Sequence, residues 1–168
     1  ALDTTATNAT ATIYGIDSWS NSGTIMNVYH NSLRIGGTGV SGGSSAGLYD
    51  HYTHTSNFKD NIVLNTRSNG AGTGKHYGIL VGASYLSSLT SDYNDILATG
   101  TGGYFGNDGT ADRLTLAAWQ TATGKDGRCA SKLVRGLLTF LVLAMLLAAF
   151  SLPSMAQTQS DPASQPAA

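Results

Sequence analysis

The chain alternates short apolar runs with polar and glycine-rich stretches, and two motifs recur along it at nearly the same interval. The first motif is a glycine between two larger residues, at Tyr14-Gly15-Ile16, Ala46-Gly47-Leu48 and Tyr77-Gly78-Ile79. The second is a polar turn around Asn31, Asn61 and Asn94, which stand 30 and 33 positions apart. Two interleaved series with one shared period indicate a chain that winds into repeating coils.

Between these motifs, the apolar positions predict short strands that end in glycine turns. Apolar residues favour strands near residues 12–16, 24–35, 57–65, 77–81 and 86–98. Glycine-rich turns follow at 36–39, 68–74 and 99–103. Such short strands cannot bury their own apolar faces, so the coils must stack on one another. We therefore predict an all-β fold, a parallel β-helix (solenoid) of about three coils over residues 12–126, with residues 1–11 as a lead-in or incomplete coil.

Equivalent residues in stacked coils lie one strand spacing apart, which is about 4.8 Å. At that spacing Asn31, Asn61 and Asn94 would form a structural ladder in which each side-chain amide bonds to turn backbone groups and to the next amide. The alternative is that the three asparagines occupy unrelated surface turns, where asparagine is common. We favour the ladder because the asparagines share their period with the glycine motif.

The composition limits the classes of function that the chain can serve. Charged residues make up 11% of the sequence and the formal net charge is -1. A nucleic-acid-binding surface needs clustered Lys and Arg, so we expect no nucleic-acid partner. The 21 glycines and the many Ser, Thr and Asn residues would suit a disordered linker, but the regularly spaced Tyr, Ile, Leu and Val residues favour a folded repeat.

A short helix is expected after the coils, from about Leu116 to Ala122, with Thr115 as its N-cap. The strand ending in Asp92-Tyr93-Asn94, together with the Leu-x-x-Trp-x-x-x-x-Gly-x-Asp segment that ends at Asp126, resembles right-handed parallel β-helix repeat proteins of bacterial cell surfaces and secretomes. The resemblance covers about residues 12–126. It implies the fold but no single activity, because the family includes glycan lyases, glycan hydrolases, adhesins and spacers.

From Gly127 onwards the chain follows a different pattern. Residues 127–156 begin with basic residues, continue through an apolar run at 137–150 and end in small residues, which is the order of a secretory signal peptide. A separate apolar transmembrane helix over 136–152 is the rival interpretation, and a buried C-terminal helix is a third. We favour a signal-like segment joined to an unrelated β-helix fragment. The tail, 157–168, is predicted to be disordered.

Three aspartates beside the ladder are weak candidates for a site: Asp60, Asp92 and Asp95. Carboxylates from adjacent coils can hold Ca²⁺, or serve as acid and base in glycoside hydrolysis. Aspartate also favours turns for purely structural reasons, and we prefer that interpretation. We therefore assign no catalytic residue, no metal ligand and no cofactor, with Ca²⁺ as the one candidate ion.

Asp50, His51 and His54 share one loop, and a metal site would need further ligands that the sequence does not supply. We expect this loop to be solvated, at the rim of a coil. For function, we expect a non-catalytic exported or cell-surface module, a fragment of a larger protein, that is adhesin-like or contacts polysaccharide. The alternative is a carbohydrate-active enzyme, a polysaccharide lyase or a glycoside hydrolase. Membrane contact is expected only through residues 136–152, as an anchor.

Overall fold

The structure is a computed structural model that describes residues 2–5, 10–38 and 40–128. The chain divides into two compact units, Ala1–Arg135 and Gly136–Ala168, and every described residue belongs to the first. The expected signal-like or membrane segment from Cys129 to residue 156 and the expected disordered tail at 157–168 lie outside the described residues.

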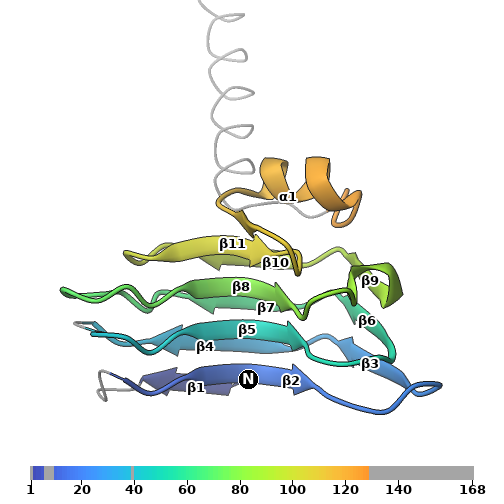
Figure 1. The fold of residues 1–168 in the computed structure, drawn as a ribbon, viewed down its shortest axis with the longest axis horizontal. Helices are drawn as coiled ribbons and strands as arrows, with labels where there is room; N and C mark the ends of the chain where they lie inside the picture. The colour runs from blue at the N-terminus through green and yellow to red at the C-terminus, as the bar shows by residue number, and fades with distance from the viewer. Residues whose placement is uncertain (1, 6–9, 39, 129–168) are drawn as a thin grey trace, which may run out of the picture. The chain divides into compact units, whose positions relative to one another are not determined.

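Three sheets run along the first unit, and their strands are stacked in successive layers (Figure 1). The first sheet consists of β1 (Leu2–Thr5), β4 (Ser32–Gly36), β7 (Ile62–Asn65) and β10 (Asp95–Ala98). The second consists of β2 (Ile13–Ser18), β5 (Ser45–Asp50), β8 (His76–Val81), β11 (Gly103–Asn107) and β12 (Asp112–Arg113). The third consists of β3 (Ile25–Tyr29), β6 (Thr55–Lys59) and β9 (Leu89–Asp92).

Each coil takes one strand from each sheet, in the order β2-β3-β4, β5-β6-β7 and β8-β9-β10. Strands of successive coils pair in parallel, so that Leu33 aligns with Val63 and Val63 aligns with Ile96. Only β12, which pairs with β11, is antiparallel among the described strands. The predicted all-β parallel solenoid of about three coils is therefore confirmed.

The expectation of two short strands in each coil was wrong in one respect, because a sharp turn divides the second predicted strand, at 24–35, 57–65 or 86–98, into two. The turn residues His30, Asp60 and Tyr93 have φ values of 56°, 57° and 59°, which is the left-handed region. Each of them directly precedes a ladder asparagine and separates β3 from β4, β6 from β7 or β9 from β10. The coil is therefore three-sided rather than two-sided.

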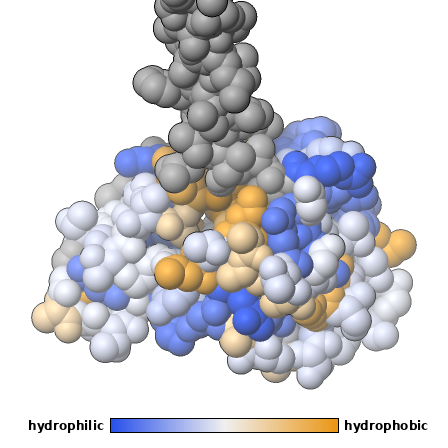
Figure 2. All heavy atoms as spheres, turned by 90° about the horizontal axis from the view of Figure 1, so that it is seen from above, coloured by the Kyte–Doolittle hydropathy of each residue, from blue (hydrophilic) through white to orange (hydrophobic). Residues whose placement is uncertain are grey.

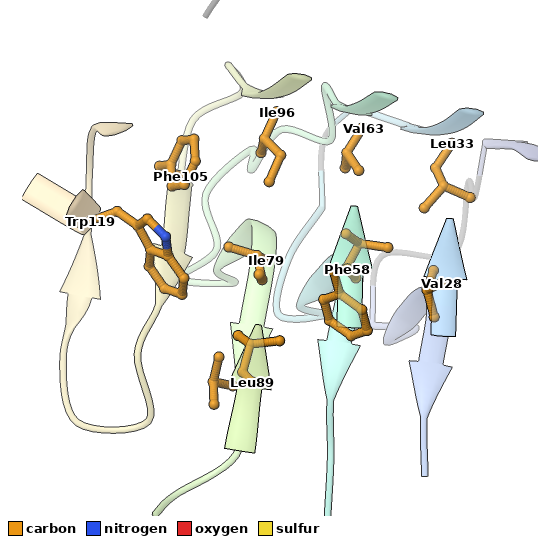
Figure 3. Packing of buried hydrophobic residues seen from close by; sticks show 11 residues of the cluster. Val28, Leu33, Phe58, Val63, Ile79, Leu89, Ile96, Phe105 and Trp119 are labelled. Atoms are coloured by element: carbon orange, nitrogen blue, oxygen red, sulfur yellow. The ribbon is translucent and has the colours of Figure 1, made fainter. Parts of the chain in front are cut away.

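Apolar side chains from all three sheets fill the centre of the coils (Figure 3). Leu33, Val63 and Ile96 form one row along the first sheet, and each is at most 5% exposed. Val28 and Phe58 pair across the third sheet in the same way. Stacking in register thus buries side chains that no single coil could cover.

The recurring glycines allow opposite sides of the coil to approach each other closely. A Cβ atom on Gly47 would lie 2.2 Å from Cγ1 of Val63, and one on Gly78 would lie 2.1 Å from Cγ2 of Ile96. Both distances are far shorter than a carbon–carbon contact, so only glycine fits at these positions. The glycine motif in the sequence therefore marks the positions where the two sides of the core lie too close together for a side chain.

The helix α1 (Leu116–Thr123) follows the last coil and closes the core at that end (Figure 1). The side chain of Thr115 accepts a hydrogen bond from the Ala118 amide, as an N-cap does, and Gly124 ends the helix at φ 67°. Trp119 is fully buried, with its ring centroid 5.9 Å from that of Phe105. The predicted short helix is confirmed, one residue longer than expected.

Candidate functional site

The structure brings the three predicted ladder residues together in one column. Nδ2 of Asn31 donates to Oδ1 of Asn61 at 3.0 Å, and Nδ2 of Asn61 donates to Oδ1 of Asn94 at 2.9 Å. The backbone amides of Asn31 and Asn61 donate to the same two oxygens, at 3.0 and 3.1 Å. These bonds satisfy the polar groups at the turn, so the column is a structural element of the coil.

The column continues into Asp126, which was not among the predicted ladder residues. Nδ2 of Asn94 donates to Oδ1 of Asp126 at 3.1 Å, and Nε1 of Trp119 donates to Oδ2 at 2.9 Å. Burial raises the pKa of the Asp126 carboxyl, and hydrogen bonds from Ser91, Asn94 and Trp119 counteract that rise. Asp126 thus joins the helix α1 to the end of the ladder.

The three candidate carboxylates do not converge on one point. Asp60 is exposed, and Asp95 aligns with the apolar Ile62 on the neighbouring strand. Asp92 is held by Arg128, whose Nη2 lies 2.6 Å from Oδ2. Burial alone would raise the pKa of Asp92, but hydrogen bonds from Arg128 and from the Tyr93 amide outweigh it and lower the pKa. No two of these three carboxylates therefore form a free acid–base pair.

The loop after β5 differs from its expected solvated state, because Asp50 and His54 are buried. Nε2 of His54 lies 2.7 Å from Oγ of Ser18 and 2.9 Å from Oγ of Ser56, and Ser56 donates to Oδ1 of Asp50 at 2.8 Å. Burial raises the pKa of Asp50. The serines of two coils therefore hold this Asp–His pair inside the solenoid, away from any external ligand.

His51, in contrast, is part of an aromatic row on the outer side of β2 and β5. The row runs from Trp19 to His51, Tyr49 and Tyr14, with successive ring centroids 5.1, 4.3 and 4.8 Å apart. Trp19 is 66% exposed and Tyr14 is 41% exposed. Among the described ring contacts Trp19 touches only His51, so its other face is not covered by a ring.

One carboxylate, that of Asp17, lies beside the aromatic row. Oδ1 of Asp17 lies 3.0 Å from Nδ1 of His51, which fixes the imidazole between Trp19 and Tyr49. Burial, and then the neighbouring Tyr14 and Asp17, raise the pKa of Tyr49, so its phenol is neutral. Nothing in the row is a strong cation, which makes it suited to an uncharged ligand.

The regularly spaced tyrosines are visible in the sequence, but the aromatic row could not be predicted from it. Its members come from two neighbouring strands and the residue or loop that follows each, and the register of β2 with β5 brings them together. In the sequence, Tyr14 and Tyr49 stand next to the recurring glycine motif, which indicates the coil to which each belongs. The motif does not indicate the direction of their side chains.

Comparison of the chain with protein-family models, with curated proteins and with solved structures finds no match. Within residues 2–5, 10–38 and 40–128, no group of three or more His, Cys, Asp or Glu side chains is placed to hold a metal ion. In the same part of the chain no helix has both the length and the apolar character needed to cross a bilayer.

Proposed function

We propose that the chain is a non-catalytic, exported or cell-surface β-helix module of bacterial type, a fragment of a larger protein, that contacts polysaccharide through the aromatic row. The observation that carries the proposal is the exposed indole of Trp19 at the end of a rigid stack of rings. The negative face of an aromatic ring attracts the positively polarised C–H groups on the apolar face of a sugar ring. The stack holds the indole in place, so little conformational freedom is lost on binding.

The proposed export rests on the basic and apolar run after Gly127. The alternative, a lyase or glycoside hydrolase, requires carboxylates arranged around a scissile bond. Nothing specific favours that alternative, because Asp92 is engaged by Arg128 and Asp60 and Asp95 have other surroundings. We therefore retain binding as the function.

The test is a binding titration of the full chain with soluble neutral oligosaccharides. Trp19→Ala should weaken binding about tenfold, which corresponds to the loss of about 1.4 kcal/mol and falls within the range of an aromatic contact. Tyr29→Ala is the matched control, because Tyr29 is an exposed aromatic on β3, outside the row. Equal affinity of the wild type and Trp19→Ala would refute the proposal, and the release of new reducing ends or unsaturated sugars would establish the enzymatic alternative.

A further inference from the structure

Two hollows at the α1 end of the solenoid share one residue, Lys125. The first has a volume of about 490 Å³ and lies between α1, the segment after β8 and the β11–β12 hairpin. The second, of about 400 Å³, lies between β9 and the segment Gly124–Arg128. Figure 2 views the molecule from this end, where polar and apolar side chains are mixed. Lys125 therefore lines both hollows.

Lys125 differs from the other cations of the two hollows in having no carboxylate partner among the described residues. Arg113 lies 2.6 Å from Oδ2 of Asp108, and Arg128 lies 2.6 Å from Oδ2 of Asp92. Among the described residues, the one hydrogen-bond acceptor of Nζ of Lys125 is a carbonyl oxygen, that of Leu89. An ammonium has three donors, so two remain for a ligand.

The position of Lys125 makes an anionic ligand favourable. Partial burial lowers the pKa of Lys125, because the ammonium has lost part of its hydration. Asp50 and Asp126 act in the opposite direction on the same pKa, but neither forms an ion pair with Lys125. A ligand carboxylate at Nζ would provide the charge-assisted hydrogen bond that the protein leaves unmade.

The first hollow is also lined by four residues with hydroxyl groups, Ser84, Ser87, Thr110 and Thr123, beside the apolar Leu86 and Ala122 and the Asp108–Arg113 ion pair. The hydroxyls of Thr110 and Thr123 donate to Asp108 and to the Trp119 carbonyl, and they can still accept hydrogen bonds. Hydroxyls donate and accept hydrogen bonds, as the hydroxyls of a sugar do. A cation beside a set of hydroxyls therefore matches a sugar that carries one acidic group. The aromatic row, with no strong cation, matches a neutral sugar instead.

We propose that the two hollows lined by Lys125 bind an acidic sugar unit of a polysaccharide, with its carboxylate on Nζ of Lys125. This inference rests on the proposed function, since it assigns a second subsite and a sugar class to the same binding module. Lys125 is the specificity-determining residue, and the aromatic row holds neutral units. Inorganic phosphate is also an anion and could bind at Nζ of Lys125. It is smaller than a sugar unit, so it would not reach the more distant hydroxyls of the first hollow.

The test is a titration of the full chain with a uronic acid oligomer, with a neutral oligomer of the same linkage and with inorganic phosphate, each at low and high salt. Lys125→Gln keeps a hydrogen-bond donor and removes the charge. It should weaken uronate binding about tenfold, the value of one charge-assisted hydrogen bond, and reduce its salt dependence. Lys59→Gln, which removes a positive charge from β6, is the matched control and should bind like the wild type.

A second variant keeps the proposal testable if Lys125→Gln fails to fold. Ala122 lines the first hollow and is exposed on α1, so Ala122→Glu adds a negative charge without disturbing the core. It too should weaken uronate binding and leave neutral binding intact. Unchanged uronate affinity in either folded variant would overturn the proposal, as would phosphate binding as tightly as the uronate. Loss of neutral binding in Trp19→Ala bears only on the aromatic row, so the two proposals fail separately.

Discussion

Replacing Asn61 should strongly destabilise the solenoid, because its side chain is buried in the middle of the asparagine ladder. Asn61 is 1% exposed and its side chain makes four hydrogen bonds within the ladder and its turn. Two are donated, to the carbonyl of Val28 at 2.9 Å and to Oδ1 of Asn94 at 2.9 Å. Two are accepted, from the amide and the side chain of Asn31.

The magnitude follows from these four bonds. A buried hydrogen bond contributes about 1 kcal/mol net, and a buried partner left unsatisfied costs about 1–3 kcal/mol. Asn61→Ala should therefore lower the free energy of unfolding by about 4 kcal/mol, which is a large part of the roughly 5–15 kcal/mol typical of a domain. Asn61→Asp keeps the shape but has no donor when ionised, so it places an oxygen against the Val28 carbonyl and should be at least as destabilising.

Asn57 provides the matched control. Its Nδ2 donates to Oδ1 of Asn27 at 2.8 Å, one coil away, in the same kind of asparagine pair, but that pair is exposed. Asn57→Ala should cost no more than about 0.5 kcal/mol, since water replaces the lost bond. Asn31→Ala, at the half-buried end of the ladder, should fall between the two.

Urea unfolding followed by circular dichroism measures these differences as changes in the transition midpoint at constant slope. Reversibility and an unchanged native spectrum are required of each variant. A cost for Asn61→Ala within about 1 kcal/mol of that for Asn57→Ala would refute the reasoning, because it would mean that burial of the ladder adds nothing to the strength of its bonds.

Three further predictions concern the core and its buried titratable groups. Gly47→Ala should cost at least about 2 kcal/mol in urea unfolding, because the new methyl would overlap Val63, whereas Gly42→Ala, with nothing within 4 Å, should be almost neutral. Burial raises the pKa of Asp50 in the folded protein. The stability of the wild type relative to Asp50→Asn should therefore be highest below the ordinary aspartate pKa of about 3.9, and it should decline as the pH rises through the pKa of Asp50 in the folded protein. A difference in urea midpoint that does not depend on pH would contradict this. Burial lowers the pKa of His76 to about 4, so its imidazole resonances in NMR should not titrate near pH 6.5, and stability from this group should be lost as the pH falls from about 6.5 towards 4.

The repeat could be predicted from the sequence because the coil imposes one period on two kinds of position. Gly47 and Gly78 repeat because a Cβ atom would collide with the opposite side of the core. Asn61 and Asn94 repeat because each closes the hydrogen bonds of the coil before it. Constraints that recur in every coil leave a periodic pattern, and a periodic pattern can be read without coordinates.

The third strand of each coil was not predicted, because the residue with positive φ differs from coil to coil and only the asparagine after it recurs. His30, Asp60 and Tyr93 all adopt positive φ, yet only aspartate and histidine are among the residues that favour it. Tyr93 at that position has an unfavourable local conformation, and its ring lies 4.3 Å from the guanidinium carbon of Arg128, which gains a cation–π contact. Tertiary contacts therefore override the local preference at Tyr93. The recurring asparagine indicates a polar turn but does not show that the turn divides the strand.

The buried Asp50–His54 pair was misread for a related reason. Two polar residues in a loop indicate a solvated loop unless their partners are known. Here the partners are Ser56, in the same coil, and Ser18, which is 36 positions before His54 and in the coil before it. The interior of a three-sided coil has corners where polar groups from successive coils meet, and the sequence does not show which residues reach them.

The helix α1 takes the place of a coil, and this has a consequence for the proposed acidic-sugar subsite. Asp126 lies 32 positions after Asn94, close to the earlier intervals of 30 and 33, so the helix uses the length of one coil to return the chain to the ladder. On that return, Nζ of Lys125 donates to the carbonyl of Leu89, and the amide of Asp126 donates to the carbonyl of Ser91. These two bonds cover the edge of β9. The solenoid is therefore capped at this end. The segment that protects the strand edge is also the segment that places Lys125 in the lining of both hollows. The proposed subsite therefore requires the cap to be formed. A substitution at Asp126 that loosens the cap should weaken uronate binding although Lys125 itself is unchanged.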